Sequence, residues 1–382
     1  MGKEDLSKVL IVYGGNSTEH DISIITAVTI YKRYKLKNIK PELVYQTKDG
    51  RWFMGERLDD FKTYKNFDPS KFKEVCFESG SNYLFSKKKT KLHKEFRVEF
   101  VINCFHGGAG EDGRFSAFME CCKIPSSCSS SVALGIAMDK YLTKLFAISL
   151  DVPVVDFFNF SFTEWLNFKD RVVQQLMQFD FPVVVKPVRQ GSSIGVSFVS
   201  TLDDFVSAVN LAFKFDNNVI VERAVTQKRE FNCCLVRTSE GKILYGVDEP
   251  VADKVVITFK DKYLVAGQKG KTKLNKNQKL YLGMENQKRK SSGLSSKEVS
   301  KLYKMSRALY ENLDMQGVVR FDYIFDTKKD KFYLGEINAI PGSLGYYFFD
   351  DINLLELVYN AGKMYWDKKF GLNIVGAPSI FN

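Results

Sequence analysis

Histidine and tryptophan are scarce in this chain of 382 residues, which contains three of each. Three isolated histidines (His20, His93 and His106) do not favour a metal site built from several imidazoles. The seven cysteines include two adjacent pairs but no C-x-x-C spacing, which argues against a zinc site or a disulfide framework and favours buried reduced thiols. No stretch reaches the roughly 18 apolar residues that a membrane span requires, so we expect no contact with a membrane.

A secretion signal is also missing from the first residues. The segment MGKEDLSKVLIVYGG mixes acidic and basic residues, with neither the apolar core nor the small-residue cleavage site of a signal peptide. We therefore expect a cytoplasmic protein. With 45% hydrophobic and 26% charged residues the composition is that of a globular protein. At roughly 100–200 residues per domain, the length predicts two or three domains.

The net charge of +11 is accompanied by a concentration of lysines between Lys254 and Lys290. A lysine-rich run is most often a solvated loop, and the alternatives are a nucleic-acid surface or a contact with an anionic small molecule. Neither a recognition-helix pattern nor an aromatic stacking platform lies nearby. We therefore interpret the charge as a property of a loop and expect no nucleic-acid partner.

The order of strand-like and helix-like segments predicts an α/β and α+β protein in three parts. KVLIVYGG is a buried strand ended by two glycines, and a helical pattern follows it, which is the opening of an α/β domain. Glu111 and Asp112, in a later glycine-rich loop of this part, fit plain turn formers. Hairpins and helices then alternate, and antiparallel strands follow. We predict domains at 1–130, 131–223 and 224–382.

The segment PVRQGSSIGV joins two predicted strands through a turn of small residues. Its backbone N–H groups are suited to an anion, and Gly191 and Gly195 permit close approach of a phosphate, although such turns are common in hairpins. Lys186 lies in an otherwise apolar strand, where an ammonium group needs an anionic partner or an exit to solvent. Lys140 lies in SVALGIAMDKYLTKLFAISLD, which is predicted to be one helix, and fits an ordinary solvated position.

Two apolar strands near the C-terminus carry polar residues at alternating positions. Arg320 and Asp322 share one face of VVRFDYIF, and Glu336 and Asn338 share one face of YLGEINAIPG. If the strands pair, two carboxylates and an amide converge into an oxygen-ligand set that suits Mg²⁺. The alternative is a solvated sheet face on which Arg320 and Asp322 form an ion pair, but the apolar neighbours favour burial.

Seven segments of the chain follow one another in a recognisable order. They are VYGGNSTEHDIS, FHGGAGEDG, AMDKYLTK, FPVVVKPVRQGSSIGV, VIVERAV, RFDYIF and GEINAIPG. Each segment is weak alone, but in this order they resemble the D-alanine–D-alanine ligase family of the ATP-grasp superfamily. The resemblance implies a three-domain ATP-grasp fold with an N-terminal Rossmann-like parallel-sheet domain, a small central α+β domain and a C-terminal antiparallel-sheet domain.

The resemblance also implies a reaction. Such a ligase uses ATP with Mg²⁺ or Mn²⁺ to phosphorylate the carboxylate of one D-alanine, and the amine of a second D-alanine then attacks the acyl phosphate. The implied products are D-alanyl-D-alanine, ADP and phosphate, for peptidoglycan synthesis, with small amino acids as partners and a homodimer as the assembly. Phosphoryl transfer depends mainly on positioning and charge neutralisation, which lysines, an arginine and metal ions supply.

Individual residues acquire roles from the same resemblance. Arg320 stabilises the oxyanion and the transferring phosphoryl group. Considered without the resemblance, Glu19 fits a capping box. The resemblance instead implies that Glu19 anchors the ammonium group of the first substrate, with Ser192 orienting it and His106 nearby. The nucleotide and metal residues are Lys140 and Lys186 for phosphates, Gly191, Ser192 and Ser193 closing over them, Glu222 for adenine, Glu230 for ribose, and Asp322, Glu336 and Asn338 for Mg²⁺.

Two regions depart from the family pattern. The basic loop lies where the family has a mobile lid, and within it Lys262 and Tyr263 resemble a pair that contacts the second substrate. The family continues after Pro-Gly with a Thr-Ser-x-Ser-like run, whereas this chain has PGSLGYYFF, which places Gly342 and Tyr347 in the second-substrate pocket. We therefore expect a second substrate other than D-alanine, or a carboxylate held by Tyr346, Tyr347 or a loop lysine.

Three other functions are alternatives. A related ATP-grasp ligase would join a different amino acid or amine. A basic nucleic-acid-binding protein would carry its lysines on one continuous face and bind with strong salt dependence. A non-catalytic nucleotide-binding relic is the least consistent with the sequence, because Arg320, Asp322, Glu336 and Asn338 are all present.

Overall fold

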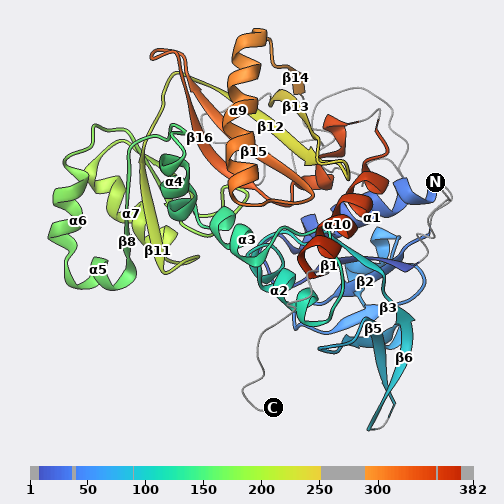
Figure 1. Ribbon diagram of the computed structural model, residues 1–382. Helices are drawn as coiled ribbons and strands as arrows, with labels where there is room; N and C mark the ends of the chain where they lie inside the picture. The colour runs from blue at the N-terminus through green and yellow to red at the C-terminus, as the bar shows by residue number, and fades with distance from the viewer. Residues whose placement is uncertain (1–7, 37–39, 89, 251–288, 350–351, 371–382) are drawn as a thin grey trace, which may run out of the picture.

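Three β-sheets organise the chain in the computed structural model (Figure 1). The structure describes residues 8–36, 40–88, 90–250, 289–349 and 352–370. The predicted lysine-rich loop therefore lies largely outside the described residues, together with Lys262 and Tyr263. Among the helices that are described, none combines the length and the apolar character needed to cross a membrane.

The N-terminal part is built on a seven-stranded sheet of mixed direction. Its strands are β1 (Val9–Gly14), β2 (Glu42–Gln46), β3 (Trp52–Met54), β4 (Lys73–Phe77), β5 (Tyr83–Lys88), β6 (Lys91–Arg97) and β7 (Phe100–Asn103). β1 pairs in parallel with β2 and β7, whereas β2 to β6 pair antiparallel in succession. The polar span after residue 57 thus extends the sheet, and its β5–β6 hairpin projects from the body (Figure 1).

Helix α1 (His20–Leu36) covers one face of this sheet, and α2 (Arg114–Cys121) packs into the core on the other face. α1 begins at His20, after a turn at Thr18 and Glu19. The reason is local, because the Ser17 hydroxyl donates to the His106 carbonyl at 2.6 Å and accepts from the Glu19 N–H at 3.1 Å. This non-helical turn brings Glu19 to the start of the helix.

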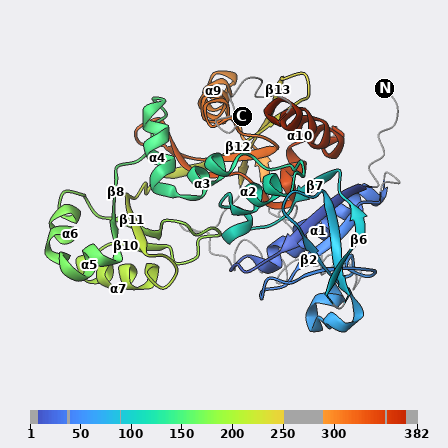
Figure 2. The same ribbon diagram turned by 60° about the horizontal axis from the view of Figure 1, so that its bottom comes forward.

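A four-stranded antiparallel sheet forms the central part, at the left of Figure 2. Its strands are β8 (Phe157–Ser161), β9 (Val183–Pro187), β10 (Ser197–Val199) and β11 (Asn218–Arg223), and its helices are α5 (Phe162–Asn167), α6 (Lys169–Leu176) and α7 (Leu202–Ala212). The helices cover one face only. Along β9, Val183 and Val185 enter that core, so Val184 and Lys186 project from the opposite face.

A five-stranded antiparallel sheet forms the C-terminal part, in the order β14-β13-β12-β15-β16. Its elements are β12 (Lys228–Arg237), β13 (Ile243–Pro250), β14 (Arg289–Ser291), β15 (Val318–Asp326), β16 (Lys331–Asn338), the 3₁₀ segment η7 (Gly342–Phe348) and the helices α9 (Ser296–Asn312) and α10 (Leu354–Phe370). The predicted pairing of β15 with β16 is confirmed, with Asp322 opposite Glu336 and Arg320 opposite Asn338.

The prediction of one helix after residue 131 is wrong, because the chain forms α3 (Ser131–Met138) and α4 (Lys140–Ser149). Asp139 has extended backbone angles and caps α4, accepting from the backbone N–H groups of Tyr141 and Leu142. Both helices share a hydrophobic core with β16 and with α2.

The C-terminal helix α10 bridges the first and third sheets, since Tyr359 packs on the first sheet and Val358 on the third.

Candidate active site

A cleft lies between the uncovered face of the central sheet and the C-terminal sheet. It encloses about 1270 Å³ of space, including its open mouth. The lining brings together residues from elements far apart in the chain. The family resemblance assigns these residues to the nucleotide, its metal ion and the transferring phosphoryl group. The predicted residues that line it are Lys140, Lys186, Ser193, Glu222, Glu230, Arg320, Asp322 and Glu336.

A second, smaller pocket adjoins the cleft on the side of the N-terminal sheet. The two share Lys140, Gln190, Arg320 and Glu336 as walls, so a group bound in one lies next to a group bound in the other. The predicted residues that line this second pocket are Glu19, His106, Lys140, Gly191, Ser192, Arg320, Glu336, Asn338 and Gly342.

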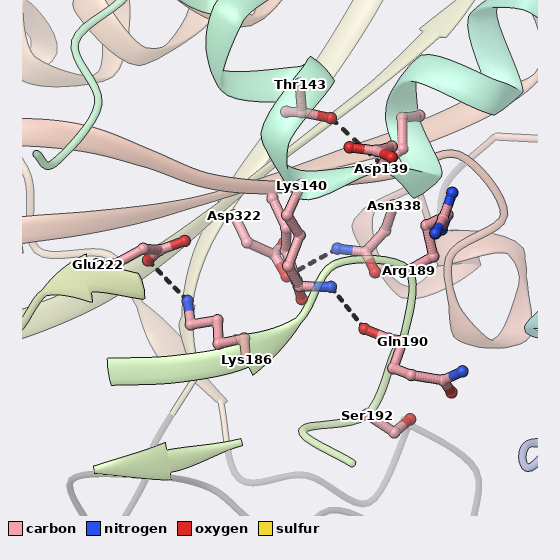
Figure 3. A network of polar contacts seen from close by, with 12 residues as sticks. Asp139, Lys140, Thr143, Lys186, Arg189, Gln190, Ser192, Glu222, Asp322 and Asn338 are labelled. Carbon is pink, nitrogen blue, oxygen red and sulfur yellow. Dashed lines mark hydrogen bonds and ion pairs between the residues drawn. The ribbon is translucent and has the colours of Figure 1, made fainter. Parts of the chain in front are cut away.

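Glu222 is the anionic centre of a buried ion-pair triad in the wall of the cleft, and Figure 3 shows its contact with Lys186. Its side chain is 2% exposed, and its two oxygens lie 2.8 Å from Lys186 Nζ and 3.2 Å from Lys144 Nζ. Burial alone would raise the pKa of this carboxyl, but the two ammonium groups outweigh burial and lower the pKa to about 2. Glu222 therefore compensates only part of the charge of Lys144 and Lys186, and the triad keeps a net charge of +1 that suits an anionic ligand.

Lys140 is buried at the junction of the two pockets, so its interpretation as a solvated helix residue is wrong. The break at Asp139 turns the first residue of α4 inward, and its Nζ donates to the carbonyl of Gln190 at 2.5 Å (Figure 3). Glu336 Oε2 lies 3.9 Å from the same Nζ. Burial lowers the pKa of Lys140, which Glu336 partly opposes, so this ammonium group gains from an anion beside it.

The loop from Arg189 to Val196 joins β9 to β10 within the central sheet and contacts Glu19 of the N-terminal part. Arg189 is held by Asp216 at 2.7 Å, and Ser192 Oγ donates to Glu19 Oε1. A Cβ placed on Gly191 would lie 2.6 Å from Glu19 Oε2, so a larger residue at this position would displace the carboxylate. Ser192 and Ser193 have left-handed φ angles of 49° and 58°, a conformation that costs most side chains energy and is common at binding sites.

Polar side chains of β15 and β16 form the far wall of both pockets. Arg320, 6% exposed, donates to both oxygens of Asp322 at 2.7 and 2.8 Å, and Asn338 Nδ2 donates to Asp322 Oδ2 at 2.8 Å. The predicted ion pair is therefore present, but on a buried face. β16 has a β-bulge at Gly335, between the pairs Asp322–Glu336 and Tyr323–Leu334, and Gly335 itself lines the cleft.

Oxygen atoms of Asp322, Glu336 and Asn338 fit Mg²⁺ by their chemistry. Among the residues that the structure describes, no group of three or more His, Cys, Asp or Glu side chains is arranged to hold a metal ion. Two carboxylates with one amide are nevertheless the kind of partial ligand set that Mg²⁺ completes with waters and nucleotide phosphates. Asp322 and Glu336 face the cleft in which Lys140 and Lys186 lie, and Asn338 lines the adjoining smaller pocket.

Two acid–base groups of the second pocket have strongly shifted pKa values. Burial lowers the pKa of His106 to about 4, and the nearby Arg320 adds to this effect. Glu111 accepts from the Gly107 N–H at 2.8 Å, and its removal from water, followed by repulsion from Glu19, raises its pKa to about 8. Its interpretation as a plain turn former is therefore incomplete, because the turn places it in the pocket wall.

The departure from the family pattern at Tyr347 also lies beside this pocket. Arg320 Nη1 is 3.5 Å from the Tyr347 hydroxyl, at the limit of a hydrogen bond. Tyr346 instead packs under Arg33 of α1, whose guanidinium carbon lies 3.1 Å from the ring centroid. Of the two tyrosines, Tyr347 is therefore the one aimed at the Arg320 side of the pocket.

Several residues of the site escaped the sequence analysis. Lys144 lies in a recognised segment without a signal of its own, and the sequence around Glu111 indicated only a turn, because the partners of both residues come from distant strands and loops. Gln190 was passed over because its contact to Lys140 uses the backbone carbonyl, which any residue supplies. Lys228 pairs with Glu230 at 2.5 Å, and its alternation with Glu230 on β12 was the available signal.

Comparisons with known proteins agree along most of the chain. A family model of the D-ala D-ala ligase N-terminus matches residues 8–129, and one of the D-ala D-ala ligase C-terminus matches residues 146–352. A D-alanine–D-alanine ligase of Thermosipho melanesiensis is 32% identical over 346 residues, which cover 89% of this chain and 87% of that protein. One from Campylobacter jejuni subsp. doylei is 31% identical over 352 residues, 91% of this chain and 90% of that protein.

Solved structures share the fold. The D-alanine–D-alanine ligase of Helicobacter pylori superposes with a TM-score of 0.74 at 24% identity and covers 94% of this chain and 98% of that one. The VanG D-Ala:D-Ser ligase of Enterococcus faecalis gives 0.72 at 20% identity, with 94% and 99% covered. At these identities the likeness supports the three-sheet architecture, and the two proteins differ in the second amino acid that their names give.

Proposed function

The chain belongs to the D-alanine–D-alanine ligase family, and we propose that it joins two molecules of D-alanine with ATP to give D-alanyl-D-alanine, ADP and phosphate. The observation that carries this proposal is the junction of the two pockets at Lys140, Arg320 and Glu336. A nucleotide in the larger cleft would direct its terminal phosphate toward an amino-acid carboxylate in the smaller pocket. Positioning of this kind supplies most of the catalysis in phosphoryl transfer.

In this proposal the larger cleft binds ATP. Lys140 and Lys186 contact the phosphates, Glu222 accepts from the adenine amino group, and Glu230 accepts from the ribose. Asp322, Glu336 and Asn338 hold Mg²⁺, or Mn²⁺ in its place, and the ion when bound neutralises charge on the phosphates. Both carboxylates lie on the cleft face of the paired strands, which supports this assignment.

The smaller pocket then binds the amino acids. Glu19 attracts the ammonium group of the first D-alanine, and Ser192, which already donates to Glu19, orients it. Arg320 stabilises negative charge on the phosphorylated carboxylate and on the tetrahedral intermediate, because its charge is fixed and its position is held by Asp322. The loop from Arg189 to Val196 excludes water from the acyl phosphate.

We further propose the coarse organisation of the protein. Domains at 1–130, 131–223 and 224–382 fit the three sheets, with α3 and α4 attached to the third sheet through β16. The partners are small amino acids, and the assembly is a homodimer, as the family resemblance implies. A cytoplasmic location, in which thiols stay reduced, agrees with seven cysteines that are all free.

Phosphate release tests the proposal. Purified protein with ATP and Mg²⁺ should turn over with D-alanine alone and yield the dipeptide, which mass spectrometry identifies. Parallel reactions pair D-alanine with D-serine, D-lactate, L-amino acids and simple amines, because Tyr347 sits where the family pattern has a serine. Turnover only with one of these other acceptors would show that the protein is a related ligase with a different second substrate. No turnover with D-alanine or with any of these acceptors would refute the proposal.

Glu336→Gln provides the matched variant for the metal. Since glutamine keeps the shape but loses the negative charge, the Mg²⁺ concentration needed for half-maximal rate should rise sharply while the circular dichroism spectrum stays the same. Glu74→Gln, an exposed side chain of β4, is the control for a general loss of charge. Turnover of Glu336→Gln at the wild-type rate and Mg²⁺ requirement would remove Glu336 from the ligands.

A further inference from the structure

The hydroxyl group of Thr26 connects two walls of the smaller pocket. Thr26 lies on α1 and is 1% exposed. Its Oγ1 is 2.9 Å from Nε2 of His106, and the backbone N–H of Ser343 donates to it at 3.2 Å. Within the described part of the chain these are the two hydrogen-bond partners of the Thr26 side chain. One hydroxyl group thus contacts the pocket histidine and the start of η7.

The hydrogen bonds of the Thr26 hydroxyl group determine which ring nitrogen of His106 carries the proton. The Ser343 N–H can only donate, so Oγ1 accepts this bond through one lone pair. The hydroxyl hydrogen then has Nε2 of His106 as the acceptor within reach among the described residues. The opposite arrangement, with Nε2 protonated, would leave a buried hydroxyl hydrogen without an acceptor, which is unfavourable. The ring is neutral near pH 7 because burial lowers the pKa of His106 to about 4.

The second ring nitrogen of His106 is then the protonated one. His106 lines the smaller pocket with Glu19 and Arg320, and its Nδ1 has no hydrogen-bond partner among the described residues. A neutral N–H at this place is a donor that stays available across the neutral pH range. It suits a carboxylate oxygen, which is a group that every amino-acid substrate of the pocket carries.

The other bond of Thr26 reaches a turn with unusual backbone angles. Ser343 and Leu344 have left-handed φ angles of 52° and 50°, and Gly345 follows at 61°. Successive left-handed residues with side chains cost about 1–2 kcal/mol each in isolation, so contacts that hold the first of them matter for the whole turn. Gly342, directly before it, lines the smaller pocket, and Tyr347 lies at its end.

We propose that Thr26 is a positioning residue for the ligase reaction: it fixes the proton of His106 on Nδ1, so that this ring donates to a substrate carboxylate, and it holds the turn at Ser343 in the same pocket. The carboxylate part of this proposal rests on the proposed function. The proton assignment does not, because it concerns the ligand-free protein.

Nitrogen NMR tests the proton assignment directly. With three histidines in the chain, ¹⁵N-histidine labelling gives three ring systems, and His20→Gln and His93→Gln assign them by subtraction. Nε2 couples to both ring carbon-bound hydrogens and Nδ1 mainly to one, so the spectrum at pH 7.5 tells which nitrogen is protonated. We expect protonated Nδ1 for His106. A protonated Nε2 in the wild-type protein would overturn the proposal, whatever the enzyme turns over.

Two variants of Thr26 then test the positioning. Thr26→Val keeps the shape without the hydroxyl, so His106 should show a mixture of tautomers and the KM for D-alanine should rise about tenfold. The KM for ATP and kcat should change less than threefold, because a binding contact is lost rather than a transition-state contact. Thr26→Ser restores the hydroxyl and should return both the tautomer and the KM toward wild type.

Ser23→Ala is the matched control on the same helix. Its hydroxyl is equally buried and also makes two hydrogen bonds, from the Gly14 N–H at 2.7 Å and to the Cys104 carbonyl at 2.8 Å, but neither reaches His106. We expect Ser23→Ala to lower the melting temperature without changing the tautomer or the KM for D-alanine. An unchanged KM in Thr26→Val, or an equal rise of KM in Ser23→Ala, would refute the positioning role. If Thr26→Val does not fold, the wild-type spectrum still decides the proton assignment, and Thr26→Ala, with the same expected rise of the KM for D-alanine, tests the positioning role.

Discussion

Replacing Glu222 by glutamine should lower the free energy of unfolding by about 3 kcal/mol at pH 7, because this buried carboxylate is the shared anion of Lys144 and Lys186. The magnitude follows from the pKa. The two ammonium groups hold the pKa of Glu222 at about 2, against 4.5 for a free side chain. At 1.36 kcal/mol per pH unit this difference corresponds to about 3 kcal/mol. Removing one partner of a buried ion pair costs a similar amount, about 3–5 kcal/mol.

The sign of the pH dependence follows from the same shift. Because the folded-state pKa is depressed, the stabilisation is fully present above pH 4.5 and is lost as the pH falls toward 2. Protonated Glu222 resembles glutamine, so the wild-type protein and Glu222→Gln should differ most near neutral pH and converge at the acid end. Other carboxylates titrate in both proteins alike, and their effects cancel in the difference.

Urea unfolding, followed by fluorescence and by circular dichroism at several values between pH 2.5 and 7, measures this difference. Glu56→Gln, an exposed side chain of the N-terminal part, serves as the control and should change the free energy of unfolding by less than about 0.5 kcal/mol. A loss below about 1 kcal/mol for Glu222→Gln at pH 7, or a loss that does not shrink with acid, would show that the two lysines do not depend on this anion.

Three further predictions concern the smaller pocket. Arg320→Ala should lower kcat by about 10²–10³-fold, on the scale of one lost oxyanion donor, and a loss under tenfold in a steady-state assay would contradict that role. Tyr347→Phe should raise the KM for the second D-alanine about tenfold if the hydroxyl binds its charged carboxylate, and an unchanged KM would leave this to other groups. Glu111→Gln should raise the melting temperature of the ligand-free protein more at pH 9 than at pH 5, because a folded-state pKa raised to about 8 destabilises the wild type as the pH rises from 4.5 through 8. Equal shifts at both pH values would argue against a buried neutral carboxyl.

The pairing of β15 with β16 could be predicted because it depends on local rules. Side chains alternate along a strand, so Arg320 with Asp322 and Glu336 with Asn338 had to share faces once the strands paired. The hairpin with the small-residue turn followed from its flanking β-branched strands in the same way. Residues whose partners lie on a neighbouring strand are thus within reach of sequence reasoning.

Contacts between different sheets could not be predicted from local sequence patterns. Lys144 pairs with Glu222 because the break at Asp139 turns α4, and a continuous helix was predicted there. The contact of Ser192 with Glu19 joins residues far apart in the chain. The local sequence around Gly191 does not indicate that this glycine packs against the Glu19 carboxylate. Such contacts are set by how whole sheets pack, which periodicity along one strand or helix does not encode.

The bridging helix α10 has a consequence for how this protein is made. The core on one face of the first sheet includes Ile340, Leu344, Leu355 and Tyr359, and the ring of Tyr359 lies 5.1 Å from that of Phe100 on β7. These side chains are synthesised roughly 250 residues after the first sheet is complete, a delay of tens of seconds at about 5–20 residues per second. During that time the apolar face of the nascent sheet is only partly covered. The growing chain therefore offers an early binding surface to chaperones, and a ribosome stalled before the last helix would release a product prone to aggregation.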